Sequence, residues 1–341
     1  MKPKILVTGG TGYIGSHTII DLIECGYVPI SVDNGWNSDT SVLSKIKKIT
    51  GQDVKHYPFD LCNFKDTEKI FEENENIVGI IHFAALKAVG ESTEIPLMYY
   101  KNNLISLINM LELSDKYRIK AFIFSSSCTV YGEGQQSPID EKAQLIPASS
   151  PYGSTKQFSE TIINDYTPKT QFQSVLLRYF NPAGAHSSGL IGESPRNIAL
   201  NLVPVITETA IGKRKSMTVF GEDYTTRDGT CIRDYIHVCD LAHAHTLALK
   251  YVLEGRQKVK IDVFNLGIGE GLTVLEIIKA FERVSGQKLN YHIGEKRPGD
   301  VQAIYANIQK AKEVLLWQPT KTVDDIMQTA WTWEKNRSAN I

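Results

Sequence analysis

Tyr152 and Lys156 stand four positions apart, directly after Pro151. Proline is favoured in the first turn of a helix, so we expect both side chains on one face of one helix. At this spacing an ammonium group favours the phenolate and lowers the pKa of the tyrosine. A phenol with a lowered pKa can act as a general base towards a hydroxyl group near neutral pH. Alone, such a pair is usually part of a solvated helix face, so its surroundings decide its meaning.

Three serines precede this pair at the end of an apolar run. The run begins at Ala121 and ends in Ser125, Ser126 and Ser127, which is typical of a buried strand. Open α/β sheets bind ligands at the carboxyl ends of their strands, so polar side chains there are candidates for substrate contacts. The serines therefore favour a functional role for the tyrosine and lysine that follow.

The N-terminal segment predicts a binding site for a phosphate-bearing ligand. A β-branched apolar run beginning at Lys4 leads directly into Gly9, Gly12 and Gly15. In this order one glycine allows a tight turn, one lets the backbone approach a pyrophosphate, and one lets helix pack on strand. The free N–H groups of the helix N-terminus then face the anion.

A second apolar run, from Val28 to Val32, ends in Asp33. A carboxylate at this place accepts hydrogen bonds from the ribose diol of an adenosine. It also repels a 2′-phosphate. The sequence therefore predicts NAD, and not NADP, as the cofactor.

Apolar runs alternate with helical patterns, which is typical of a parallel sheet covered on both faces. We expect an α/β fold: a Rossmann-type doubly wound parallel sheet with a smaller, discontinuous C-terminal α/β substrate domain. Further strands are expected at 54–57, 77–84, 121–126, 174–180 and 263–266, and helices at 13–25, 64–73, 95–117, 152–166, 238–254, 273–285, 307–316 and 322–336. From Asn181 onward, glycine, proline and polar clusters indicate loops. The predicted NAD-binding domain is 1–180 plus about 235–266, and the substrate domain is 181–234 plus about 267–341.

The composition excludes several classes of function. The 341 residues include 37 basic and 38 acidic side chains, so no general attraction to nucleic acid or to a membrane is expected. No apolar run is long enough to span a bilayer and no signal-peptide pattern is present, so we expect a cytoplasmic protein. The five cysteines, at positions 25, 62, 128, 231 and 239, are scattered and lack metal-ligand spacing, so they predict reduced thiols and no metal site. We interpret His82, His186 and His237 as packing or hydrogen-bonding residues.

Over its whole length the sequence resembles the UDP-galactose 4-epimerase (UDP-glucose 4-epimerase) family of extended short-chain dehydrogenases/reductases. The resemblance is carried by the segments 9–17, 82–92, 124–132, 177–182, 228–238 and 297–300. It implies a UDP-hexose substrate and a bound NAD that takes a hydride from C4 of the sugar. The hydride returns to the opposite face of the 4-keto intermediate.

The same resemblance implies the site residues. Tyr152 would be the catalytic base, Lys156 the group that tunes it, and Ser127 a contact to the sugar 4-oxygen. NAD would contact Gly9, Gly12, Tyr13, Ile14, Gly15, Asp33, Asn34, Asn37, Ser38, Asp60, Leu61, Phe83, Ala84, Lys87, Asn102, Tyr152, Lys156 and Tyr179. The UDP-sugar would contact Ser127, Tyr152, Asn181, Asn201, Phe220, Arg233, Arg297, Asp300 and Ile304.

Physical arguments support some of these assignments. A cation at Lys87 would complement a pyrophosphate, although an exposed surface lysine is the simpler interpretation. Arg233 and Arg297 suit a diphosphate, because guanidinium groups form paired charge-assisted bonds, and Asp300 can hold a ribose diol. Arg233 and the adjacent Asp234 could instead form a structural ion pair.

Position 304 is where the family resemblance implies a residue beside the C2 substituent of the sugar. A tyrosine there tends to exclude N-acetyl groups, and Ile304 is smaller. We therefore expect activity on N-acetylated UDP-hexoses as well, although Ile304 could equally be a core aliphatic in a short strand. Ala85 and Cys128 depart from the Gly and Ala that are common in related sequences, without removing a catalytic group.

Two alternatives share this fold. A nucleotide-sugar 4,6-dehydratase would carry an Asp-Glu pair where Cys128 and Thr129 stand, and a non-catalytic NAD-sensing protein would lack Tyr152 and Lys156. The resemblance also implies a homodimer, formed through the helices expected at 95–117 and 152–166.

Overall fold

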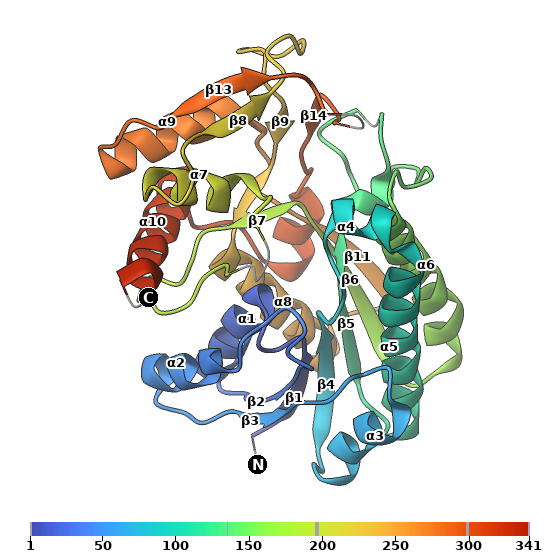
Figure 1. Ribbon diagram of the computed structural model, residues 1–341. Coiled ribbons are helices and arrows are strands. Elements are labelled where there is room, and N and C mark those ends of the chain that lie inside the picture. The colour runs from blue at the N-terminus through green and yellow to red at the C-terminus, as the bar shows by residue number, and fades with distance from the viewer. Residues whose placement is uncertain (1, 135, 195–197, 298–299, 340–341) are drawn as a thin grey trace.

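The computed structural model describes residues 2–134, 136–194, 198–297 and 300–339 (Figure 1). Its larger part is a seven-stranded sheet in which each neighbouring pair of strands is parallel. In spatial order the strands are β11 (Ile261–Leu266), β6 (Gln173–Tyr179), β5 (Ala121–Ser127), β4 (Ile77–His82), β1 (Lys4–Thr8), β2 (Val28–Val32) and β3 (Lys55–Tyr57). This order confirms the predicted doubly wound α/β fold.

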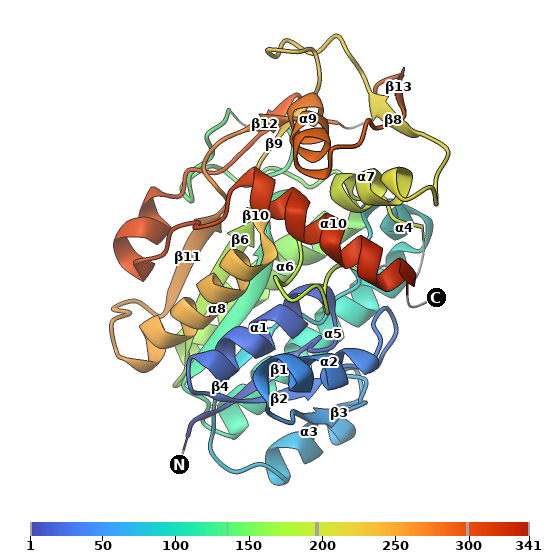
Figure 2. The same cartoon turned by 90° about the vertical axis from the view of Figure 1, so that its left-hand side faces the viewer.

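Helices cover both faces of this sheet, which explains why its central strands are apolar along their whole length. One face carries α1 (Tyr13–Glu24), α2 (Ser41–Thr50) and α8 (Val238–Leu253), and Figure 2 shows α1 and α8 side by side. The other face carries α3 (Phe64–Glu72), α5 (Pro96–Lys116) and α6 (Pro151–Tyr166), with the short α4 (Val89–Glu94) before α5. In β1, Ile5, Leu6 and Val7 are fully buried between the two layers.

The smaller part lies above the carboxyl ends of the strands in Figure 1. Its core is formed by α7 (Leu202–Ala210), α9 (Val274–Ser285) and α10 (Val323–Ala339). Its short strands are β8 (Met217–Phe220) paired with β13 (Tyr291–Gly294), β9 (Ile232–Arg233) between β12 (Leu272–Thr273) and β14 (Ala303–Ile304), and β7 (Asn181–Ala183) paired with β10 (Tyr235–His237). The 3-10 turns are η1 (Cys128–Tyr131) and η2 (Thr167–Lys169).

The segment around residues 307–317 bears on where the two domains meet near the C-terminus. The helix expected at 307–316 is only a π-helical turn, η3 (Ala311–Leu315). Its neighbours Ile308 and Trp317 are buried in the same apolar cluster as α1 and α8. We therefore propose that the segment around η3 belongs to the nucleotide-binding domain, although the sequence pattern assigned it to the substrate domain.

The sequence pattern missed three helices, of which α2 is one. Along Ser41–Thr50 the apolar residues Val42, Leu43, Ile46 and Ile49 follow a helical period and pack on the same cluster as α1, but only Ile46 is fully buried. Helices α4 and α7 were also not expected. None of the helices in the described ranges is long and apolar enough to cross a membrane.

Candidate active site

The turn between β1 and α1 has the geometry that a pyrophosphate needs. Gly9 has φ +66°, and its N–H donates to the carbonyl oxygen of Val32 at 2.8 Å. A Cβ on Gly15 would lie 2.2 Å from the carbonyl oxygen of Gly9, so only glycine lets the helix come this close to the turn. Gly12 caps α1 without a capping side chain. The first N–H groups of the helix therefore remain available to an anion.

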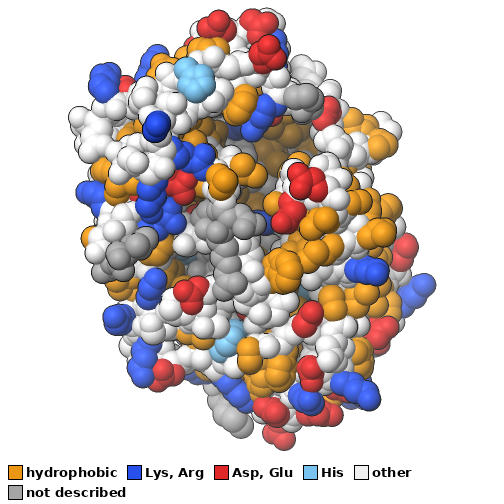
Figure 3. Space-filling view, viewed as in Figure 1, with side chains coloured by type: hydrophobic (Ala, Val, Ile, Leu, Met, Phe, Trp, Pro, Cys, Tyr) orange, Lys and Arg blue, Asp and Glu red, His pale blue; other side chains and the backbone are white. Residues whose placement is uncertain are grey.

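A cavity of about 1530 Å³ begins at this turn and reaches into the smaller domain. It exceeds the roughly 300–1,000 Å³ of most small-molecule sites, so it has room for a dinucleotide and a second ligand. Figure 3 shows the surface hollowed beneath the smaller domain. Every position at which NAD contacts were expected lines the cavity: Gly9, Gly12, Tyr13, Ile14, Gly15, Asp33, Asn34, Asn37, Ser38, Asp60, Leu61, Phe83, Ala84, Lys87, Asn102, Tyr152, Lys156 and Tyr179.

Asp33 lies at the carboxyl end of β2, where its own loop orients the carboxylate. It accepts hydrogen bonds from the N–H of Gly35 and the hydroxyl of Ser38, both at 2.9 Å, and from the N–H of Thr11 at 3.3 Å. Asp33 lines the cavity beside the glycine turn. This arrangement fits an adenosine ribose, and a 2′-phosphate would be repelled there.

The catalytic candidates come together where α6 packs against the end of β5. Ser150 caps the helix by accepting a hydrogen bond from the N–H of Gly153 at 3.1 Å, and Pro151 occupies its first turn. Tyr152 and Lys156 are therefore on one helical face, and both are buried in the cavity wall. The ammonium of Lys156 donates to the carbonyl oxygen of Ser125 at 2.7 Å and lies 5.9 Å from the ring centre of Tyr152.

Burial dominates the acidity of this pair. It raises the pKa of Tyr152 well above its ordinary value, and the nearby Tyr179 raises it further, whereas a hydrogen bond with Ser127 lowers it. Burial also lowers the pKa of Lys156 to about 8, against the opposing effect of Glu160. Ser127 is thus a neighbour that favours the phenolate.

In the smaller part of the structure, two guanidinium groups lie around one carboxylate. Arg297 binds Asp300 with two hydrogen bonds, at 2.7 and 3.1 Å, and Arg233 reaches the same carboxylate at 3.3 Å. The guanidinium of Arg297 also lies 4.7 Å from the ring centre of Phe220, which is partly exposed. Two cationic side chains suit a diphosphate, and the aromatic ring beside them suits a nucleobase.

The alternative of an ion pair between Arg233 and its neighbour Asp234 does not form. The buried carboxylate of Asp234 accepts the backbone N–H groups of Ile268, Gly269 and Ala306 at 2.7–3.2 Å. Asp234 thereby links the β9–β10 connection to two later loops. Arg233 forms its ion pair with Asp300 instead.

Asn181, Asn201, Phe220, Arg233, Arg297 and Asp300 all line a smaller cavity of about 260 Å³ in the substrate domain. Asn201, Phe220, Arg297 and Asp300 line the large cavity as well. Ser127 and Ile304 line neither one in the described chain. Ser127 is buried at the end of β5, where its hydrogen bond lowers the pKa of Tyr152. Ile304 pairs with Arg233 between β14 and β9 and packs against the apolar cluster of Val130, Tyr131 and Ile139.

Glu193 is a cavity residue that the sequence pattern did not reveal. It lies 3.5 Å from the ammonium of Lys87 and accepts a hydrogen bond from the amide of Asn201 at 2.8 Å. Lys87 is the cation that we expected beside a pyrophosphate. Its positive charge is therefore partly neutralised by Glu193 in this structure. Glu193 lies in a loop without hydrophobic periodicity, so no local signal could have found it.

The three singled-out histidines have structural partners. His82 is buried between aromatic rings with Nδ1 3.0 Å from the hydroxyl of Thr8, and burial lowers its pKa to about 3. His186 bonds Ser188, and His237 caps α8. In the described residues none of them belongs to a cluster of metal-ligating side chains.

Comparison with known proteins finds relatives that match this chain over nearly its whole length. The family model described as GDP-mannose 4,6 dehydratase matches residues 6–330. The chain is 46% identical over 333 residues to UDP-glucose 4-epimerase of Bacillus subtilis, covering 97% of each protein. It is 44% identical to UDP-glucose 4-epimerase of Bifidobacterium longum, whose crystal structure is a complex with NAD+ and UDP, with a TM-score of 0.93 and coverage of 99% and 100%. The UDP-Glc/GlcNAc 4-epimerase of Campylobacter jejuni is 36% identical, with a TM-score of 0.84 and coverage of 98% and 99%.

Proposed function

The chain belongs to the UDP-glucose 4-epimerase family, and we propose that it interconverts UDP-glucose and UDP-galactose with a bound NAD. One observation carries this proposal. A single cavity is lined by the dinucleotide-binding turn, by the buried Tyr152 and Lys156, and by the arginine and aromatic side chains of the substrate domain. Such a cavity brings a dinucleotide and a nucleotide sugar into contact away from bulk water.

The chemistry follows from where the proton of the sugar 4-hydroxyl can go. Held by the glycine turn and Asp33, NAD would supply hydride transfer from and back to C4 of the sugar, with no net oxidation. Tyr152 removes and later restores the hydroxyl proton, because its phenol lies in the cavity wall. The hydrogen bond with Ser127 stabilises the phenolate. Lys156 is placed one helical turn away to add a positive charge.

The diphosphate end of the substrate is assigned to Arg233 and Arg297. Both guanidinium groups are held towards one spot by Asp300, so they are oriented before the ligand binds. Phe220 beside Arg297 provides a flat apolar surface for the uracil ring. These assignments place the sugar towards Tyr152 and the nucleotide in the smaller domain.

A 4,6-dehydratase is less well supported, even though the matching family model carries that description. Elimination across C5 and C6 needs an additional acid and base. Cys128 and Thr129 follow Ser127, and burial raises the pKa of the Cys128 thiol to about 12, so neither side chain supplies an acid–base pair at neutral pH.

We extend the proposal to N-acetylated UDP-hexoses. The Campylobacter jejuni relative acts on both UDP-Glc and UDP-GlcNAc by its description. In this chain Ile304 is paired with Arg233 across β14 and β9, so position 304 lies beside the proposed diphosphate site. The aliphatic side chain of Ile304 is consistent with a pocket that admits an acetamido group.

We also propose a homodimer formed by α5 and α6, which pack against one another. Their outer surface carries exposed apolar side chains, and Leu97 and Phe158 are 71% and 50% exposed. Ile105 and Ile108 continue this surface along α5. In Figure 3 hydrophobic side chains gather on the side where Figure 1 places α5. A contiguous apolar surface of this kind marks a protein contact.

The cytoplasmic location stays a prediction.

The proposed activity is tested by incubating the purified protein with UDP-galactose and no added cofactor. We expect conversion to UDP-glucose, and acid extraction should release NAD and no NADP because of Asp33. A 4-keto-6-deoxy product would instead support the dehydratase, and bound NAD without turnover would support a sensing protein.

The roles of Tyr152 and Lys156 are tested by single-turnover reduction of the bound NAD, followed by absorbance. Tyr152→Phe should retain NAD and slow the reaction at least about a hundredfold. Lys156→Met removes a positive charge near the phenol, so the pKa of Tyr152 should rise and the ascending limb of the pH–rate profile should move up by about one unit. Near-normal reduction in Tyr152→Phe would remove the phenol from this role.

The breadth of the sugar site is tested at position 304. Ile304→Tyr should lower kcat/KM for the N-acetyl substrate by about tenfold or more, the scale of 1–3 kcal/mol from overpacking. Activity on the plain hexose serves as the control for folding and should change much less. The proposal is contradicted if the wild-type protein ignores UDP-N-acetylglucosamine, or if the substitution leaves the ratio of the two activities unchanged.

The dimer is tested by sedimentation equilibrium. Phe158→Lys should raise the dissociation constant at least about a hundredfold, because an unpaired ammonium buried in an apolar interface costs about 3 kcal/mol or more. Val259→Lys is the matched control, since Val259 is also about half exposed, at 52%, but lies outside both helices. Equal association of the two variants would argue against this interface.

A further inference from the structure

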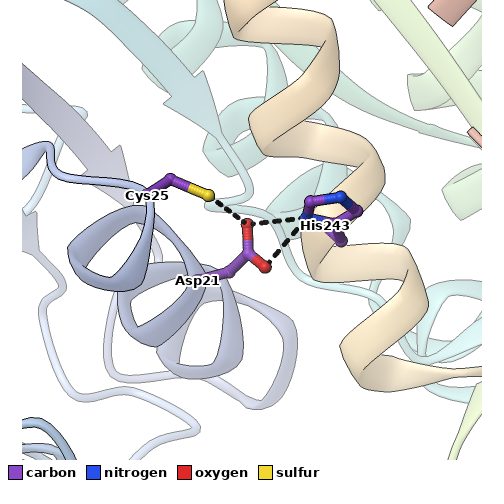
Figure 4. A group of neighbouring side chains, drawn as sticks. All are labelled: Asp21, Cys25 and His243. Carbon is purple, nitrogen blue, oxygen red and sulfur yellow. Dashed lines mark hydrogen bonds and ion pairs between the residues drawn. The ribbon is translucent and has the colours of Figure 1, made fainter. Parts of the chain in front are cut away.

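Three side chains able to bind a metal meet on the outer surface of α1 and α8. Asp21 and Cys25 lie one turn apart at the end of α1, and His243 faces them from α8 (Figure 4). The Nδ1 atom of His243 lies 3.1 and 3.4 Å from the two carboxylate oxygens of Asp21. The sulfur of Cys25 lies 3.9 Å from the nearer oxygen, Oδ2. The three ligand atoms are all within 4.8 Å of one another.

The nitrogen–oxygen separations are close to the edges of a tetrahedral zinc site, and the sulfur of Cys25 must move closer by a few tenths of an ångström. Zinc binds sulfur at about 2.3 Å, imidazole nitrogen at about 2.0–2.1 Å and carboxylate oxygen at about 2.0–2.2 Å, so tetrahedral ligand atoms lie roughly 3.3–3.6 Å apart. We propose that Asp21, Cys25 and His243 bind one zinc-type divalent cation, with water as the remaining ligand. A thiolate, an imidazole and a carboxylate together form a donor set that zinc favours over magnesium or calcium.

The surroundings suit a cation that arrives from solvent. Cys25 and His243 are exposed, and Asp21 is partly exposed. Glu24 and Asp240 add negative charge near Cys25 and His243, and Lys250 offsets part of it. The ligands lie on two helices that pack on each other and on the sheet, so binding needs only side-chain adjustments.

The metal would be structural, not catalytic. Asp21, Cys25 and His243 line neither of the two cavities found in the described part of the chain. Asp21 lies nine residues beyond Gly12, so the cluster is on the order of 14 Å along α1 from the pyrophosphate turn. A bound ion would hold α1, whose first turn binds the cofactor, against α8. It would stabilise the folded protein according to its concentration.

A hydrogen-bonded trio without metal is the simpler interpretation, and an exposed His–Asp pair contributes little to stability. The two interpretations differ in the state of the thiol. A metal ion binds cysteine as the thiolate and displaces the thiol proton, whereas the metal-free trio needs only hydrogen bonds. A thiolate signal at neutral pH therefore reports the metal.

The experiment is a titration of the NAD-loaded, chelator-treated protein with Co2+, a spectroscopic substitute for zinc. We expect one ion per chain, visible d–d bands of tetrahedral Co2+ and a near-ultraviolet thiolate-to-cobalt band, all displaced by Zn2+. The near-ultraviolet band should disappear in Cys25→Ser. Asp21→Asn and His243→Gln should each weaken Co2+ binding at least about tenfold, within the range seen for loss of a metal-site interaction. Epimerase activity does not enter this readout, so the result is independent of the proposed function.

Matched variants separate this site from other thiols and histidines. His292→Gln removes another exposed histidine, and Cys62→Ser removes another accessible thiol, so both should bind Co2+ as the wild-type protein does. A wild-type protein without the thiolate band would overturn the proposal, as would a band that survives Cys25→Ser. Full binding in both Asp21→Asn and His243→Gln would also overturn it, because it would show capture by the lone thiol.

Discussion

The active site depends on how helix α6 is fixed to the sheet. Glu160 lies four residues after Lys156 and eight after Tyr152, so the three side chains share one face of the helix. The carboxylate of Glu160 accepts hydrogen bonds from Nε and Nη2 of Arg178 at 2.9 and 2.6 Å, and from the hydroxyl of Ser126 at 2.6 Å. Ser126 and Arg178 are direct partners across β5 and β6. This buried network sets the rotation and height of α6, and with them the positions of the phenol and the ammonium.

The network also affects the charges that the reaction uses. Transferring two charged groups from water into the protein interior costs free energy of desolvation. The Arg178–Glu160 pair is therefore better explained by the geometry that it imposes on α6 than by a net gain in stability. The negative charge of Glu160 helps Lys156 to stay protonated, although burial lowers the pKa of that lysine to about 8. Burial raises the pKa of Tyr152, and the hydrogen bond with Ser127 opposes that effect.

The sequence predicted those parts of the structure that have local causes. A glycine turn between strand and helix, an acid after the second strand and a Tyr-x-x-x-Lys helix each follow from neighbouring residues, and the structure brings all of them to one cavity. Contacts between distant segments could not be predicted. Asp234 binds three backbone N–H groups from two later loops instead of Arg233, Glu193 meets Lys87, and Ile304 lies in an apolar cluster. Asp21 and His243 meet although they are 222 positions apart, which no spacing motif can reveal.

The most direct test of this account is the double variant Glu160→Met/Arg178→Met, which removes both charges while keeping similar side-chain volumes. The rate of single-turnover reduction of bound NAD by UDP-galactose is measured together with NAD content and Tm. If the pair positions α6, the variant should remain folded with NAD bound, and the rate should fall at least about tenfold, because small misplacements of catalytic groups are costly. A folded, NAD-loaded double variant that reduces its cofactor within about twofold of the wild-type rate would contradict the account.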